Sequence, residues 1–244
     1  MLLKACLNGS RLPGEHPALP LTPQELARDA QLVVAAGTHA LHIHPRSTNG
    51  EQSLAARDIA AALTAIREHC PGISVGVSTA IWIEPNVWRR LQLIQEWTVL
   101  PDFASVNFSE PGIGDLCMHF LARGVGIEAG LWSVEDAQRF LKLGLADRCL
   151  RILIELQERA IGSALTTTEA IVQCLDQEHI QLPRLLHGDH QAIVWPMLDV
   201  ALQCGYDTRI GLEDTLTLPD GKQATDNAEL VSVAINKARQ RGTL

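Results

Sequence analysis

The sequence predicts one α/β domain, a (β/α)8 barrel that spans residues 1–244. Short runs of apolar and β-branched residues alternate with amphipathic helical stretches, and this alternation implies parallel strands joined by right-handed crossovers. Eight such units fit a chain of this length, as in a TIM barrel. The phosphate-binding motifs GxGxxG and GxxxxGKS/T, which would favour an open doubly wound sheet or a P-loop fold, do not occur in the sequence.

The eight predicted strands are short and are separated by stretches long enough for a helix. We expect strands at residues 2–7, 40–44, 73–77, 103–107, 125–128, 150–154, 184–187 and 208–212. The segment Thr22-Pro23-Gln24-Glu25 predicts the start of the first helix, because it combines a capping box with proline at the first helical position. Ser133 predicts a second helix start, and three glycines predict left-handed helix ends: Gly37, Gly144 and Gly205.

Composition and charge exclude several classes of protein. The chain is 46% hydrophobic and 20% charged, which is typical of a globular protein with a sizeable core. Its formal net charge of -8 argues against a nucleic-acid partner. We expect no membrane span, because no stretch approaches the roughly 18 consecutive apolar residues that a span needs. A cytoplasmic location is therefore the expectation. The six cysteines lack close pairing, and we expect reduced, mostly buried thiols.

Polar side chains gather where the predicted strands end. In a barrel of this type the carboxyl ends of the strands carry the active site. From these positions we take six candidate substrate contacts: Asn8, Arg46, Ser78, Thr79, Asn107 and Glu128. Glu128 and His187 are selected by position alone, and each by itself would more often lie at a solvated rim. Trp82 and Trp132 follow strand ends and either wall a pocket or pack in the core.

His42 and His44 are the strongest indication of a metal site. The two residues are two positions apart on a predicted strand, so their imidazoles point to the same face of the sheet. If Ile43 packs outward, this face is the interior of the barrel. Neutral imidazole is the commonest metal ligand in proteins, and two histidines with one carboxylate form a familiar catalytic zinc set. The alternative is a pair of hydrogen-bonded core histidines.

The last predicted strand supplies a candidate third ligand. If the extended conformation of this strand continues to residue 213, one face carries Arg209, Gly211 and Glu213. We therefore assign Glu213 as the third ligand. Glycine at 211 would leave room for a ligand or metal. Asp214 could pair with Arg209, and this pair is our candidate catalytic pair; a purely structural ion pair is the alternative.

The strings Leu41-His42-Ile43-His44-Pro45-Arg46 and Arg209-Ile210-Gly211-Leu212-Glu213-Asp214 resemble those of the β-keto acid cleavage enzymes. The segments Asn8-Gly9, Leu19 to Glu25, Val77-Ser78-Thr79 and Asp226 to Val231 extend this resemblance along the chain. The resemblance implies a homotetrameric or otherwise homo-oligomeric zinc barrel with one Zn²⁺ per chain. Such an enzyme condenses a β-keto acid with acetyl-CoA, its co-substrate, and releases acetoacetate and a new acyl-CoA.

The same resemblance implies roles for individual residues. His42, His44 and Glu213 would bind the metal, Arg209 and Asp214 would be the catalytic pair, and Ser78 and Asn107 would hold substrate or the developing oxyanion. The chain departs from the family pattern at Ser47, at Ala80-Ile81, at Glu155 and at the segment His187 to His190, so its pocket differs. The alternatives are an amidohydrolase-like hydrolase, an aldolase-like lyase without CoA, and a non-catalytic metal-binding barrel.

Overall fold

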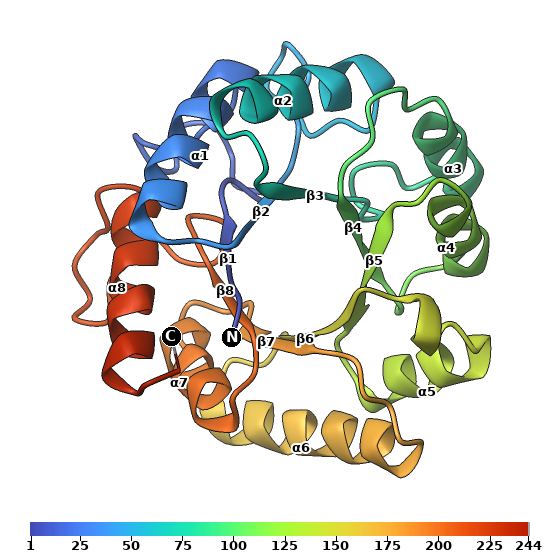
Figure 1. The fold of residues 1–244 in the computed structure, drawn as a ribbon, viewed down its shortest axis with the longest axis vertical. Coiled ribbons are helices and arrows are strands. Elements are labelled where there is room, and N and C mark those ends of the chain that lie inside the picture. The colour runs from blue at the N-terminus through green and yellow to red at the C-terminus, as the bar shows by residue number, and fades with distance from the viewer. Residues whose placement is uncertain (244) are drawn as a thin grey trace.

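The computed structural model describes residues 1–243, and these form a nearly closed ring of strands inside a ring of helices (Figure 1). The strands are β1 (Leu3–Cys6), β2 (Ala40–Ile43), β3 (Ser74–Ser78), β4 (Phe103–Asn107), β5 (Gly126–Leu131), β6 (Arg151–Leu156), β7 (Arg184–Gly188) and β8 (Thr208–Ile210). The helices are α1 (Pro23–Ala36), α2 (Ala56–His69), α3 (Val87–Gln95), α4 (Ile113–Ala122), α5 (Val134–Leu143), α6 (Ile161–Gln177), α7 (Val194–Cys204) and α8 (Asn227–Gln240). The predicted (β/α)8 barrel is thus confirmed.

All strands are parallel, and each pairs with its neighbour in the sequence in the order β7-β6-β5-β4-β3-β2-β1-β8. Strands β1 and β8, the first and the last in the chain, pair with each other, with Leu3 opposite Thr208. Between β7 and β8 the contact is a single parallel bridge, Leu185 with Asp207, supported by the Leu186 amide donating to the Asp207 carbonyl at 2.9 Å. The barrel is therefore nearly closed all round.

All eight strands lie where the sequence predicts them, although three of them end two or three residues away from the predicted position. Strands β5 and β6 continue to Leu131 and Leu156, so Glu128 and Glu155 lie within strands and not at their ends. Strand β8 is shorter than expected and stops at Ile210, because the chain then enters a turn. These shifts decide which polar residues reach the mouth of the barrel.

The helix signals in the sequence are confirmed. Thr22 caps α1 through the expected capping box with Glu25, and the Ser133 side chain accepts from the Asp136 amide at the start of α5. The three predicted glycines end α1, α5 and α7 in the left-handed conformation. Within the described chain all six cysteines are free thiols, four of them buried. No helix among residues 1–243 is long and apolar enough to cross a membrane.

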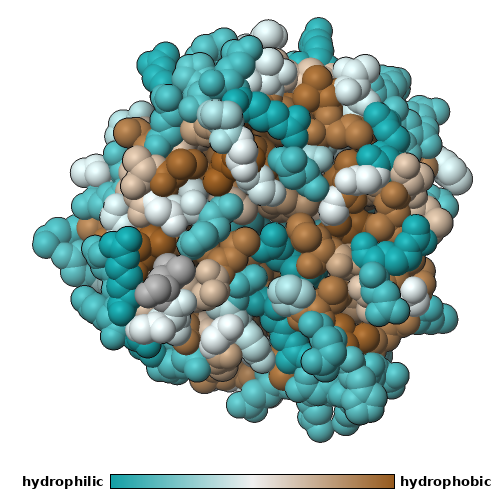
Figure 2. All heavy atoms as spheres, viewed as in Figure 1, coloured by the Kyte–Doolittle hydropathy of each residue, from teal (hydrophilic) through white to brown (hydrophobic). Residues whose placement is uncertain are grey.

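The hydrophobic core lies between the sheet and the helices. Leu41 and Ile43, which flank His42 on β2, belong to this core together with Ile59 and Leu63 of α2. Ile43 therefore packs outward, as the metal prediction requires, and the two histidines face the interior of the barrel. Figure 2 shows hydrophilic side chains over much of one face of the molecule, with hydrophobic side chains between them.

The interior of the barrel is charged in its N-terminal half. Lys4 of β1 and Arg151 of β6 both contact Glu128 of β5, and all three side chains are buried. We call these three residues the lower cluster. Burial alone would raise the pKa of Glu128, but the charges of Lys4 and Arg151 outweigh it and lower the pKa to about 2. The expectation of a solvated Glu128 is therefore wrong, because β5 carries the residue down into the barrel.

Candidate active site

A cavity of about 430 Å³ opens at the carboxyl ends of the strands. Side chains from seven of the eight β/α units and from the loop after β1 line it: Ser10, His42, His44, Ser78, Trp82, Ser105, Asn107, Trp132, Glu155, Gln157, Asp189, Arg209 and Glu213. Nine of these thirteen residues carry an imidazole, carboxylate, guanidinium or hydroxyl group, so the cavity is suited to polar chemistry.

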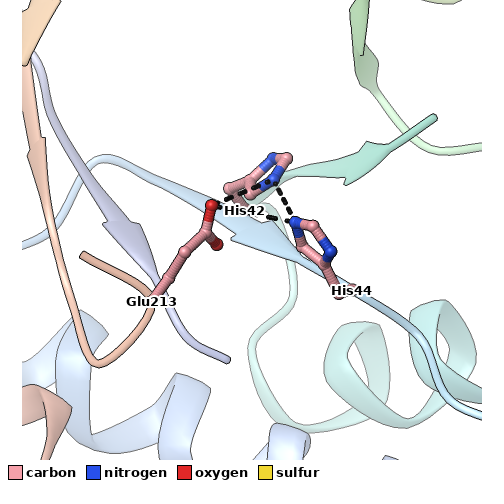
Figure 3. A group of neighbouring side chains, drawn as sticks. All are labelled: His42, His44 and Glu213. Carbon is pink, nitrogen blue, oxygen red and sulfur yellow. Dashed lines mark hydrogen bonds and ion pairs between the residues drawn. The ribbon is translucent and has the colours of Figure 1, made fainter. Parts of the chain in front are cut away.

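His42, His44 and Glu213 point toward one another at one side of the cavity (Figure 3). The two Nε2 atoms lie 3.2 Å apart, and Glu213 Oε1 lies 3.8 Å from His42 Nε2 and 3.7 Å from His44 Nε2. Ligands at 2.0–2.1 Å around a four-coordinate zinc ion are separated by roughly 3.3 Å. The three donor atoms therefore fit a zinc ion with an open position toward the cavity.

The protonation of the two histidines suits metal binding. His44 Nδ1 lies 2.6 Å from the amide oxygen of Gln52, which requires a proton on Nδ1 and leaves the lone pair on Nε2. Burial lowers the pKa of His42 to about 3, against the opposing charge of Glu213, so this ring is neutral. Each ring can therefore offer a free lone pair to a metal ion held between the three side chains.

The turn that carries Glu213 replaces the strand that the sequence predicts. Because β8 ends at Ile210, strand parity does not place this side chain; the amides of Asp214 and Thr215 bond the Gly211 carbonyl and form a tight turn instead. A Cβ atom at Gly211 would lie 1.9 Å from the Cys6 carbonyl oxygen, so only glycine allows this approach. The ligand assignment agrees with the observed geometry, but the reason for it is corrected.

Asn227, at the start of α8, fastens this turn. Its side-chain oxygen accepts from the Leu212 amide at 2.6 Å, and its nitrogen donates to the Leu7 carbonyl at 2.8 Å and to Asp29 at 2.7 Å. One buried amide thus connects the last helix, the first strand and the turn that holds Glu213. The residue stands in the Asp226 to Val231 segment of the sequence, but its bridging role is visible only in three dimensions.

Arg209 and Asp214 form the predicted pair. The guanidinium donates to Asp214 Oδ1 through Nε at 3.1 Å and through Nη2 at 2.6 Å, and Nη2 also donates to Glu213 Oε1 at 2.8 Å. Arg209 lines the cavity, whereas the Asp214 side chain lies behind it and has no exposed surface. The arginine thus joins the metal-ligand carboxylate to the candidate base.

Glu155 and His187 extend this arrangement toward the other side of the cavity. His187 Nε2 lies 3.1 Å from Glu155 Oε2, and the same oxygen lies 3.7 Å from Arg209 Nη1. We call Glu155, His187, Arg209, Glu213 and Asp214 the mouth network. His187 is buried and not solvated as expected, because it points inward from β7 and packs under Glu155.

The six predicted substrate contacts separate into two groups. Ser78 and Asn107 line the cavity, as their assignment requires. The other four lie outside its lining, and their polar groups bind the protein itself. Asn8 bonds the backbone of His44 and the Pro20 carbonyl, and the Thr79 hydroxyl donates to the Ser105 carbonyl. Arg46 donates to three loop carbonyls, and Glu128 pairs with Lys4 of the lower cluster. These four hold the site together.

Several residues of the cavity carry no motif in the sequence. Ser105, Gln157 and Asp189 reach it from loops or from the middle of a strand, and Gln52 contacts His44 from outside the lining. A lone glutamine or serine has too many structural uses for its type alone to indicate a site. Trp82 and Trp132 do line the cavity, with ring centroids 6.4 Å apart and planes inclined by 27°.

Solved structures that resemble this chain share its barrel. The apo structure of ObcA superposes with a TM-score of 0.69 at 19% identity; the match covers 93% of this chain and 63% of that longer one. The 3-hexulose-6-phosphate synthase of Salmonella typhimurium gives a TM-score of 0.61 at 13% identity, covering 99% of this chain and all of the other. At these identities the likeness concerns the fold alone.

Sequence comparison is more specific. Two proteins named 3-keto-5-aminohexanoate cleavage enzyme are similar over 99% of this chain: one from Fusobacterium nucleatum at 26% identity, over 92% of its length, and one from Acetoanaerobium sticklandii at 23%, over 93%. The family model of the beta-keto acid cleavage enzyme matches residues 1–243. With the fold and the site already described, this match over nearly the whole chain shows that the protein belongs to the β-keto acid cleavage enzyme family.

Proposed function

We propose that this member of the family is a zinc-dependent enzyme that transfers acyl groups between a β-keto acid and CoA. A β-keto acid and acetyl-CoA would give acetoacetate and a new acyl-CoA. The observation that carries the proposal is the triangle of His42, His44 and Glu213 at the wall of a polar cavity, with Arg209 bonded to Glu213. A zinc ion held there would act as a Lewis acid and stabilise an enolate.

Asp214 is the proposed base. Its Oδ2 atom accepts no hydrogen bond from a described residue, and burial raises its pKa, an effect that the charge of Glu213 reinforces. Both properties favour uptake of a proton from the carbon between ketone and carboxylate. Because Arg209 lies between Asp214 and the cavity, the proposal requires the guanidinium to move aside when substrate enters.

The bonds then change in a balanced sequence. The enolate carbon bonds to the acetyl carbonyl and expels the CoA thiolate, and the thiolate adds to the original ketone. Cleavage of the carbon–carbon bond forms the new thioester and the enolate of acetoacetate, which takes back the proton from Asp214. The Ser78 hydroxyl lines the cavity, and we propose that it donates to the oxyanion that develops in the addition steps.

We also propose that the protein works in the cytoplasm as a homo-oligomer, with a homotetramer as the expected state. Light scattering coupled to gel filtration of the purified protein measures the assembly directly. A mass of a single 26.6 kDa chain would contradict the proposal.

Metal content and turnover test the central proposal together. Elemental analysis of the wild type should give about one zinc per chain, and His42→Ala and Glu213→Ala should lose both the metal and acetoacetate formation from 3-oxohexanoate and acetyl-CoA. His69→Ala and Glu135→Ala are matched controls, because both residues are exposed on outer helices. Metal retained by both site variants, or turnover that does not require acetyl-CoA, would refute the proposal.

A further inference from the structure

Asn107 at the end of β4 lines the cavity, and the orientation of its side-chain amide decides what it offers a ligand. A carboxamide carries an acceptor oxygen at one end and a donor NH2 group at the other, so a half-turn about its last side-chain bond exchanges donor and acceptor. Two residues, Glu110 and Gly130, lie at the two ends of this amide. They therefore determine which group meets a ligand.

Glu110 holds the nitrogen end of the amide. Asn107 Nδ2 donates to Glu110 Oε1 at 2.9 Å, and the backbone amide of Ile81 donates to the same oxygen at 3.1 Å. Because a backbone N–H is always a donor, Glu110 Oε1 is an acceptor, and the group of Asn107 beside it must be the NH2 group. The reversed amide would bring two acceptor oxygens into contact. The orientation of Asn107 is thus fixed by chemistry at this end.

Arg90 of α3 holds Glu110 in turn. Its Nη1 atom pairs with Glu110 Oε2 and also donates to the Thr79 carbonyl at 3.3 Å, and Nη2 donates to the Pro111 carbonyl at 2.7 Å. Both side chains are buried, so water does not compete for this pairing. Of the described residues, thirteen line the cavity, and neither Glu110 nor Arg90 is one of them. Any effect of this ion pair on a ligand must therefore pass through Asn107.

Gly130 leaves room for the oxygen end of the amide. It stands opposite Asn107 in the register of β4 and β5. A Cβ atom at Gly130 would lie 2.7 Å from Asn107 Oδ1, which is closer than such atoms approach one another in proteins. The backbone of Gly130 does not adopt a left-handed φ, so space, and not backbone conformation, requires glycine here. Any other residue would push the Asn107 amide from its place.

We propose that Glu110 and Gly130 are positioning residues, which fix the side-chain amide of Asn107 and thereby set the hydrogen bonds that it makes with the substrate. One N–H of the amide is committed to Glu110, so the oxygen and the other N–H remain for a ligand. Glu110 and Gly130 act through Asn107 and do not touch the substrate. This inference rests on the proposed function, because its main readout is turnover in the same cavity.

Gly130→Ala tests the oxygen end of the amide with little risk to the fold. The strand itself accommodates alanine at least as well as glycine, so we expect a free energy of unfolding in urea close to that of the wild type. In the zinc-loaded variant kcat/KM for 3-oxohexanoate with acetyl-CoA should fall by roughly 10- to 100-fold, because small displacements of a positioned group have effects of this size. Gly114→Ala is the control, since its added methyl group would lie 3.8 Å from the nearest atom, on Leu143.

Glu110→Gln tests the nitrogen end of the amide. Glutamine keeps the shape of the side chain, but it removes the charge that holds Arg90 and can turn either a donor or an acceptor toward Asn107. We expect kcat/KM to fall about tenfold, as for loss of a hydrogen bond to a charged group, and the protein to be less stable. Asp199→Asn is the control, because it weakens an ion pair with Lys237 outside the cavity lining and should leave kcat/KM unchanged.

The Asn107→Ala background separates positioning from structural support. If Glu110 and Gly130 act through the amide, Glu110→Gln and Gly130→Ala should each lower kcat/KM less than about twofold once Asn107 is replaced, because the interaction that they affect is gone. The loss of stability in Glu110→Gln should persist in this background. Effects on kcat/KM that remain as large in Asn107→Ala as in the wild type would refute the proposal, and so would full kcat/KM in Gly130→Ala.

NMR of the asparagine side chains gives a readout that does not need turnover. The NH2 signals of Asn107 are identified by their loss in Asn107→Ala, and they should shift in Glu110→Gln and Gly130→Ala but not in Asp199→Asn or Gly114→Ala. If these shifts occur but the wild type forms no acetoacetate, the placement of the amide stands and the proposed function fails. If acetoacetate forms but the signals shift in neither positioning variant, the function stands and the positioning role is refuted.

Discussion

Two groups of buried charges lie in the same barrel, and their charge balance differs. In the lower cluster Lys4 and Arg151 face Glu128, and Arg151 also approaches Asp207 at 3.8 Å, so two cations meet two carboxylates. In the mouth network Arg209 alone faces Glu155, Glu213 and Asp214. The lower cluster and Asp207 together balance in charge, whereas the mouth has two more carboxylates than guanidinium groups.

This difference indicates different purposes. A buried charge without a partner is costly, so a balanced set can persist for structural reasons alone. An unbalanced set can be compensated by a cation from outside the chain, and the excess of two carboxylates over guanidinium groups at the mouth matches the charge of a divalent ion.

The largest effect should come from breaking the turn that supports the mouth. In Gly211→Ala the new methyl group would collide with the Cys6 carbonyl, so Glu213 would move and both metal and activity should fall more than about 100-fold. Gly162→Ala in α6 is the control, because no atom lies within 4 Å of its added methyl group. A Gly211→Ala protein that keeps one zinc per chain would show that the turn is not needed.

Breaking the lower cluster should affect stability and leave the metal in place. Lys4→Met leaves Glu128 with the Ser105 hydroxyl and the more distant Arg151 as partners, and we expect the free energy of unfolding in urea to fall by about 3–5 kcal/mol. The exposed Lys142→Met should change it little. Loss of zinc from folded Lys4→Met protein would contradict the separation of the two clusters.

Acid should weaken the lower cluster in a defined range of pH. The pKa of Glu128 is lowered to about 2 in the folded protein, so its contribution to stability is present above pH 4.5 and is lost as the pH falls toward 2. Between pH 5 and 2 the free energy of unfolding of the chelator-treated wild type should fall by roughly 3 kcal/mol more than that of Glu128→Gln. An equal fall in the free energy of unfolding of the two proteins over this pH range would show that Glu128 is not held ionised.

A smaller effect is expected from the support of one metal ligand. Gln52→Ala removes the acceptor that fixes the tautomer of His44, and zinc affinity should weaken about 10- to 100-fold. Competition with a chromophoric chelator measures this affinity. Gln157→Ala is the control, because it changes the same residue type at a position whose side chain contacts Glu155. This variant should bind zinc as the wild type does.

The sequence predicts what depends on local periodicity and fails where tertiary contacts decide. The eight strands and the pair His42 and His44 follow from alternation along the chain. The position of Glu213 depends on a turn closed by Asn227, 14 residues away in the chain, and Glu155 enters the cavity only because β6 runs two residues further than expected. Asn8 and Arg46 stand beside the site but turn their polar groups to backbone carbonyls, and residue type alone cannot reveal that orientation.

The bridge made by Asn227 sets an order of assembly. The turn with Glu213 is fastened to the first strand and to the first residue of α8, so the ligand is fixed only after that final helix has docked against the barrel. During synthesis, the histidines of β2 leave the ribosome long before the residues that complete the ion's binding site. Capture of the proposed metal would therefore come at the end of folding, because an incomplete chain carries only two of the three candidate ligands.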